Sequence, residues 1–159
     1  MSGQLRSGDE ISRLITERLE TCRTAAGFET DLGREVYRGR LAVDARQVPC
    51  AAIIEGNQTL SEADGRTALE VRILQEYVVL AYVPCDIKHP NDAAHQALRD
   101  VRRALFVTNG KPDRTLGDKV KRLMYRGHDI GPRADGAAFV VAQVILAVEF
   151  VEMLAEIPG

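Results

Sequence analysis

Residues 77–106 constrain the fold of this chain more than any other stretch, because they read as a strand, a turn and a helix in immediate succession. The apolar, β-branched run of the strand stops at Pro84, which lacks the N–H that a sheet ladder needs. After a short polar turn, Asn91 is expected as the N-cap of a helix that has Asp92 in its first turn. The strand therefore leads into a helix that has to pack back onto the sheet.

Two helices are expected in the chain. Ser7 and Glu10 have the spacing of a capping box, apolar residues then recur at helical spacing, and Gly27 offers a stop, so the first helix is predicted over residues 8–26. The second helix is predicted over residues 91–106. Its inward side carries Ala94, Leu98, Val101 and Leu105, and its outer side carries Arg99, Arg102 and Arg103.

The remaining periodic segments predict strands. They are residues 35–40, 47–55, 66–83, 119–130 and 137–151, separated by polar loops at 56–65 and 107–117. A short turn with Gly and Pro joins the last two strands, which are expected to form a hairpin. These elements predict an α+β fold, with two main helices on a mixed or antiparallel sheet of four to five strands. Because no composition shift marks a boundary, residues 1–159 are expected to form a single domain.

Composition and charge limit the classes of protein to which the chain can belong. Hydrophobic residues make up 45% of the chain, enough for a core without disulfide bonds, and a net charge of -2 argues against wholesale binding of a polyanion. The first residues lack the apolar centre of a signal peptide, and no apolar run reaches the length of a membrane span. Cys22, Cys50 and Cys85 have apolar sequence neighbours, so buried thiols in a reducing compartment are expected.

Catalysis and metal binding find little support in the sequence. Histidine occurs only at positions 89, 95 and 128, and neither a G-x-S-x-G elbow nor a phosphate-binding glycine loop is present. Cys85, Asp86, His89 and His95 lie within eleven positions, but their spacing matches no zinc motif, and a turn plus a helix start explains them. We therefore expect no catalytic residue, no metal site and no cofactor.

Charge is distributed unevenly along the chain. Residues 99–133 hold ten Lys or Arg and four Asp or Glu, a local balance of +6, whereas the chain as a whole carries -2. Solvated faces are the ordinary interpretation of such a run. The alternative is a molecule with a basic and an acidic side. Such a molecule could stack on copies of itself or on a partner, or turn a basic lining toward nucleic acid without reading its sequence.

Residues 66–75 are predicted to project as a half-exposed ribbon. Leu69, Val71 and Ile73 alternate with Glu70 and Arg72, which gives the ribbon one apolar side. A two-stranded ribbon with such a side is marginal in water and tends to find cover. The candidate interface residues therefore come from this ribbon and from the outer side of the second helix: Leu69, Glu70, Val71, Arg72, Arg99, Arg102 and Arg103.

Seven short segments form a set that runs through the chain: 30–33 (TDLG), 36–40 (VYRGR), 48–56 (VPCAAIIEG), 82–86 (YVPCD), 90–92 (PND), 129–133 (DIGPR) and 148–152 (VEFVE). Together they resemble the tail-terminator proteins of long-tailed bacteriophages and related prophage proteins. The resemblance extends over most of the chain, and its motifs are structural, which makes them less specific than a catalytic signature.

The resemblance implies a non-enzymatic protein with an α/β sandwich and a mixed sheet. Tail terminators form a ring, typically of six copies, on the head-proximal end of a finished tail tube, where they stop tube polymerisation. The implied partners are further copies of the chain, the tail tube protein and a head–tail neck protein. DNA would pass through the lumen without sequence-specific binding, and no membrane is involved. The implied location is the virion tail at the head–tail junction, reached after assembly in the host cytoplasm.

Two other functions stay open at this point. A head–tail stopper or adaptor of the neck shares the size and composition of a tail terminator. A small cytosolic ligand-binding domain or enzyme would instead show a convergent polar pocket in a single copy of the chain.

Overall fold

The computed structural model describes residues 4–5, 7–39, 43–60, 70–131 and 137–153. These ranges contain the α-helices α1 (Gly8–Glu20) and α2 (Pro90–Phe106) and the 3-10 turns η1 (Thr24–Ala26), η2 (Leu32–Arg34) and η3 (Ala45–Gln47). The strands are β1 (Val36–Arg38), β2 (Cys50–Leu60), β3 (Glu70–Pro84), β4 (Val107–Thr108), β5 (Lys111–Pro112), β6 (Arg122–Ile130) and β7 (Phe139–Met153).

Five strands form one mixed sheet in the order β1-β2-β3-β7-β6, and β4 and β5 form a small separate hairpin. β1 runs parallel to β2, whereas every other neighbouring pair in the large sheet is antiparallel. The predicted α+β class, with two main helices and a mixed sheet of four to five strands, is confirmed. The last two long strands, β6 and β7, are antiparallel neighbours as expected.

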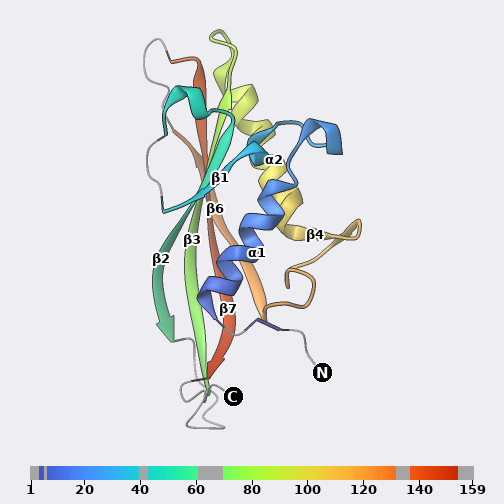
Figure 1. Cartoon of the computed structure of the whole chain (residues 1–159), viewed down its shortest axis with the longest axis vertical. Coiled ribbons are helices and arrows are strands. Elements are labelled where there is room, and N and C mark those ends of the chain that lie inside the picture. Colours follow the sequence, from blue (N-terminus) through green and yellow to red (C-terminus); the bar gives the residue numbers. More distant parts are fainter. Residues whose placement is uncertain (1–3, 6, 40–42, 61–69, 132–136, 154–159) are drawn as a thin grey trace.

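Both helices lie on the same side of the large sheet, which we call the covered face (Figure 1). At its centre, β3 and β7 are each 15 residues long and pair along their whole length. Because side chains alternate between the two sides of a strand, one set from each strand points toward the helices. Tyr77, Leu146 and Phe150 are among the largest of these side chains, and they are fully buried. Removal of this apolar surface from water is the main source of stability.

The start of α2 differs from the expected cap. The N-cap is His89 rather than Asn91, because Pro90 takes the first helical position, where its missing N–H has no partner to lose. The inward side of the helix is as predicted, with Ala94, Leu98, Val101 and Leu105 buried.

The end of α2 is held by an arginine of α1. The guanidinium of Arg18 donates hydrogen bonds to the carbonyl oxygens of Ala104 and Val107, at 3.3 and 3.2 Å, and to the hydroxyl of Thr108 at 3.0 Å. A cation at this place satisfies carbonyls that a helix C-terminus leaves open and offsets the negative end of the helix dipole.

The first helix is shorter than predicted. α1 ends at Glu20, and residues 24–26 form the separate turn η1, which Gly27 closes at φ 92°. Only a glycine adopts this left-handed conformation freely, so the predicted stop is correct for η1. Ser7 occupies the N-cap position, but its hydroxyl donates to the Glu10 carboxylate at 2.7 Å instead of accepting from the backbone.

The prediction of a loop from residue 56 is wrong up to Leu60, because β2 continues to that residue. Gln58 pairs with Gln75 and Leu60 pairs with Ile73 on β3. Ladder hydrogen bonds come from the backbone, so exposed polar side chains do not prevent pairing at the rim of a sheet. The rest of the predicted loop and the expected start of the next strand, residues 61–69, lie outside the described residues.

The predicted loop at 107–117 contains the β4–β5 hairpin and is organised around Asp113. The carboxylate of Asp113 accepts hydrogen bonds from the hydroxyls of Thr108 and Thr115 and from the backbone N–H of Thr115 and Gly117. Burial alone would raise the pKa of Asp113, but these hydrogen bonds outweigh it and hold the pKa well below its ordinary value. The predicted strand from residue 119 begins only at Arg122, after this loop.

Candidate interaction surfaces

The second face of the large sheet carries no α-helix of the described part of the chain (Figure 1). At one end, Cys50, Ala52 and Tyr82 form a small cluster that Val43 and Val48 pack against. Farther along this face, seven apolar side chains belong to neither packed cluster and are partly exposed. We call them the open face: Ile54, Leu74, Val78, Met124, Ile145, Val151 and Met153.

Strand register brings the open face together as one patch. Ile54 pairs with Val78 and Val78 pairs with Ile145, so three apolar side chains form a row across β2, β3 and β7. Charged residues on the same side of the sheet all lie to one side of this row, where Leu74 pairs with Glu149 and Val151 pairs with Arg72: Glu70, Arg72, Glu76, Arg122 and Glu149. An apolar row with such charges at its rim is typical of a surface that binds another protein.

The apolar side of the predicted ribbon is covered within the chain at Val71 and Ile73. Ile73 is 8% exposed and Val71 packs against the main core, because both point to the covered face. The expectation that this side gains cover only from a neighbouring subunit is therefore wrong for these two residues. Glu70 and Arg72 lie on the opposite side, at the rim of the open face. Leu69 lies outside the described residues, and the interface role of the ribbon stays a prediction.

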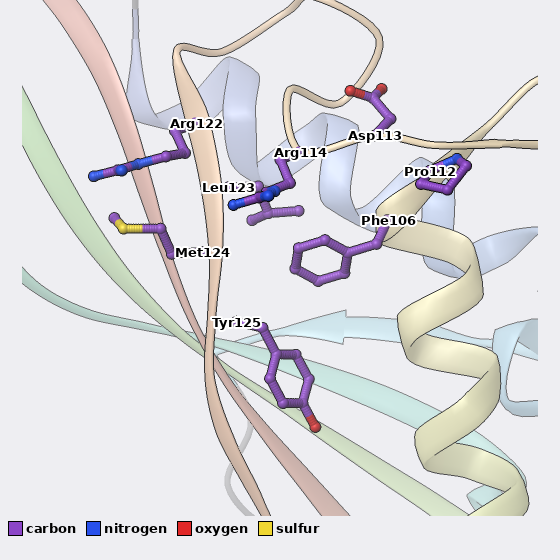
Figure 2. A pocket seen from close by; sticks show the side chains of 8 residues that line it. All are labelled: Phe106, Pro112, Asp113, Arg114, Arg122, Leu123, Met124 and Tyr125. Carbon is purple, nitrogen blue, oxygen red and sulfur yellow. The ribbon is translucent and has the colours of Figure 1, made fainter.

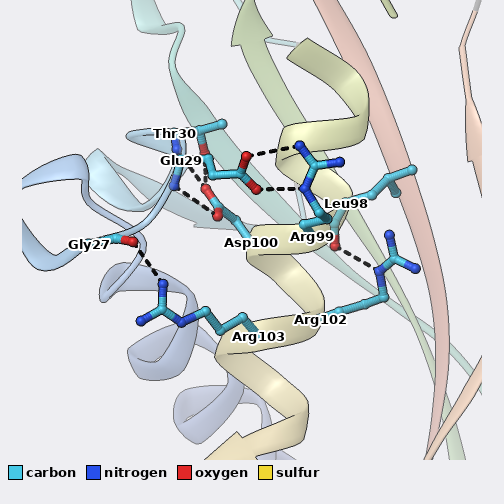
Figure 3. Close-up of polar contacts among 8 residues, drawn as sticks. All are labelled: Gly27, Glu29, Thr30, Leu98, Arg99, Asp100, Arg102 and Arg103. Carbon is cyan, nitrogen blue, oxygen red and sulfur yellow. Dashed lines mark hydrogen bonds and ion pairs between the residues drawn. The ribbon is translucent and has the colours of Figure 1, made fainter. Parts of the chain in front are cut away.

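Two of the three candidate arginines on α2 bind residues of the segment that precedes η2 (Figure 3). The Nε and Nη2 atoms of Arg99 donate to the two carboxylate oxygens of Glu29, at 2.7 and 2.9 Å. Arg103 donates to the carbonyl oxygen of Gly27 at 2.8 Å, and its guanidinium lies 4.4 Å from the ring centre of Phe28. Both arginines therefore hold residues 27–29 against α2.

Asp100 anchors the same segment from beneath (Figure 3). It is 2% exposed, and its carboxylate accepts hydrogen bonds from the backbone N–H of Glu29 and Thr30, at 3.0 and 2.7 Å, and from the Thr30 hydroxyl at 2.6 Å. A buried carboxylate is stable only when such donors replace its water. Sequence reasoning places Asp100 within a charged run and does not single it out.

Arg102 differs from its two neighbours. Its Nε donates to the carbonyl oxygen of Leu98 at 3.2 Å, and its guanidinium carbon lies 5.9 Å from the ring centre of Tyr125 on β6. Among the described residues it has no ion pair. Arg103 likewise has no ion pair there, and Arg102 is the least exposed of the three arginines, so its role as a contact for a partner stays a prediction.

Ser12, Glu55 and Tyr77 form a hydrogen-bonded group under α1. The Ser12 hydroxyl donates to the Glu55 carboxylate at 2.9 Å and lies 2.9 Å from the Tyr77 hydroxyl. Burial raises the pKa of Tyr77 to about 12, so the phenol stays protonated at neutral pH and cannot act as a base. The group ties α1 to the sheet.

Cysteine and acidic side chains are the candidate metal ligands in the part of the chain that the structure describes. In the described ranges, no three His, Cys, Asp or Glu side chains gather in a way that could hold a metal ion. Cys22 and Cys50 are buried as expected, whereas Cys85 is partly exposed, and all three are free thiols. Burial, with the nearby charge of Asp100, raises the pKa of Cys22 to about 12, which keeps this thiol unreactive.

In two comparisons with known proteins, the chain matches no protein-family model and no curated protein. Among the described helices, none has the length and apolar character needed to cross a membrane.

Proposed function

We propose that this chain is a non-enzymatic virion assembly protein of the tail-terminator type. It forms a ring on the head-proximal end of a phage tail tube, stops polymerisation of the tube and joins the tail to the neck. The open face is the observation that carries the proposal. Its seven apolar side chains lie on one side of a sheet that already has a full core on its other side. Burial of such a patch against a further protein surface is the arrangement that lowers its free energy most.

Assembly into a ring requires two different contact surfaces on each copy of the chain. Subunits of a ring are related by rotation, so one surface of each copy meets a different surface of the next. The open face supplies one of these surfaces, and its mixed rim of acidic and arginine side chains favours one docking orientation over others. The number of six copies comes from the resemblance to tail terminators. The tube protein and the neck protein would bind the two ends of the ring, and DNA would pass through it.

The test measures assembly with one matched pair of variants. Ile145→Lys places a charge in the middle of the open face, whereas Ala25→Lys adds the same charge at an exposed position of η1 on the helix side. The lysine stem can lie along the sheet in a single copy with its ammonium in water, so both variants should fold. Sedimentation velocity gives the oligomeric state, and negative-stain images of protein mixed with terminator-deficient tail tubes show whether a ring caps them.

We expect the parent chain and Ala25→Lys to cap tube ends, and Ile145→Lys to stay a folded monomer that leaves the tubes bare. Rings that bind only completed heads, and never tube ends, would identify a neck adaptor instead. If Ile145→Lys assembles like the parent chain, the open face is not the subunit interface and the proposal loses its main support.

A further inference from the structure

β6 is an edge strand of the large sheet, with β7 as its only neighbour among the described strands. Near its start, the backbone N–H of Leu123 donates to the Arg114 carbonyl at 2.6 Å. Near its end, the N–H of Ile130 donates to the side chain of Asp129 at 2.9 Å. Between these two points the outer edge faces no other described strand. Such an edge is a template for an added strand.

A cavity of about 430 Å³ opens along the first half of this edge (Figure 2). Four consecutive residues of β6 line it, so it reaches the strand from both faces of the sheet and therefore lies at the edge itself. Phe106 at the end of α2 and the segment after β5 form the opposite wall. The floor is apolar, because Leu123 is fully buried and the rings of Phe106 and Tyr125 meet at 6.0 Å between centres.

The mouth of the cavity is basic. Arg114 is exposed, and in the described part of the chain its guanidinium has no partner. Arg122 reaches the Glu149 carboxylate only at 4.0 Å, with half of its side chain in solvent. Asp113 also lines the cavity, but its two oxygens are already occupied by donors of its own loop. Asp113 keeps its negative charge, but the two arginines that line the cavity outnumber it and are the side chains that can pair with a carboxylate of a ligand.

We propose that the β6 edge binds an extended acidic segment of a partner protein as an added strand. The outer backbone of β6 pairs with the segment, a carboxylate of the segment meets Arg114 or Arg122, and an apolar side chain enters the cavity beside Phe106. The bulge at Tyr125 and Gly127 interrupts regular pairing, so the segment is short. A single copy of the chain has every group that this binding needs, and ring formation is not required for it.

A protein segment fits this edge better than a nucleic acid does. Arginines attract phosphates as well as carboxylates, but only a peptide backbone offers the alternating N–H and C=O groups that match a strand edge. The apolar floor likewise suits a Phe, Leu or Val side chain that points away from the acidic ones, which is the natural alternation of a strand.

The experiment uses designed probes on the full chain. The first probe is the capped hexapeptide Glu-Phe-Glu-Val-Glu-Val. The second has the same sequence with alternate backbone nitrogens methylated, which removes strand pairing and keeps every side chain. The third replaces Glu by Lys, and the fourth is a six-nucleotide oligothymidine. Amide chemical shifts of the protein map the site, and fluorescence anisotropy gives the affinity.

We expect saturable binding of the acidic peptide below about 1 mM, with shifts concentrated at residues 122–130 and around Phe106. The methylated and lysine probes should not bind. Arg114→Ser with Arg122→Ser should weaken binding about tenfold, whereas Arg13→Ser with Arg46→Ser, exposed arginines elsewhere, should leave it unchanged. Equal binding of the methylated peptide, shifts away from β6, or tighter binding of the oligothymidine would each overturn the proposal.

Discussion

The two faces of the large sheet are built from the same strands and behave differently. On β7, Leu146 points to the covered face and is fully buried, whereas its neighbour Ile145 points to the open face and stays partly exposed. Both are aliphatic side chains of equal size, so the sequence does not distinguish them. The position of the two helices distinguishes them. Leu146 faces the helices and belongs to the core, whereas Ile145 faces away from them and belongs to a candidate contact surface.

The largest expected effect comes from truncation of this pair. Leu146→Ala should lower the free energy of unfolding by about 3 kcal/mol, because it leaves a cavity in the packed core. Ile145→Ala should lower it by about 1 kcal/mol or less, since solvent already reaches that side chain. Urea unfolding of both variants measures the difference. Equal losses would mean that the open face is packed within the single chain.

The second prediction concerns Asp100, the buried carboxylate that holds residues 29–30 against α2. Asp100→Asn should cost about 2 kcal/mol, because one amide oxygen cannot replace two carboxylate oxygens that accept from Glu29 and Thr30. Asp92→Asn, an exposed position on the same helix, is the control and should cost no more than about 0.5 kcal/mol. Amide exchange at residues 27–30 should quicken only in Asp100→Asn. Unchanged exchange there would show that Arg99 and Arg103 hold the segment by themselves.

The third prediction concerns the loss of folding stability at acid pH. The pKa of Asp113 in the folded chain lies below its ordinary value of 3.8, so the charged form stabilises the fold above that pH, and this contribution is lost as pH falls below it. Asp113→Asn should therefore be less stable by about 1 kcal/mol at pH 7. It should also lose less stability than the parent chain between about pH 5 and pH 2. Urea unfolding at pH 7 and pH 3 decides this, and parallel losses in both proteins would contradict it.

The smallest expected effect concerns the exposed ion pair between Arg99 and Glu29. Arg99→Ser removes the ion pair with Glu29, in which both side chains are about half exposed. We expect a smaller loss of stability than in Leu146→Ala, Asp100→Asn or Asp113→Asn, since water and salt screen such a pair. A double-mutant cycle with Glu29→Gln isolates the pair, and a coupling as large as the loss in Asp100→Asn would show that the pair is as important as the buried anchor.

Sequence reasoning succeeded where the signal is local. The inward side of α2 follows from a 3.6-residue period, and the existence of the long strands follows from β-branched apolar runs. It was less accurate at boundaries: the polar residues after Glu55 hide the continuation of β2, and Pro90 moves the helix start away from Asn91. The open face could have been suspected from β7, where apolar side chains such as Ile145 and Leu146 occupy both sides of the strand.

The partners of the arginines could not be predicted in the same way. Arg99 and Glu29 are separated by 70 positions, and no local pattern relates them. The sequence pattern of an outward-facing arginine on a helix is the same whether the side chain contacts solvent, a neighbouring loop or another protein. Only the folded chain shows that Arg99 and Arg103 are engaged, and that Arg114 has no partner among the described residues.

By itself, the sequence determined which segments become helix or strand and which side chains share a side of each element, because these properties depend on periodicity over a few residues. The tertiary structure decided which face of the sheet the helices cover, which edge stays open and which charges find partners. Those outcomes depend on contacts between residues far apart in the chain, where packing and desolvation are settled for the whole fold at once.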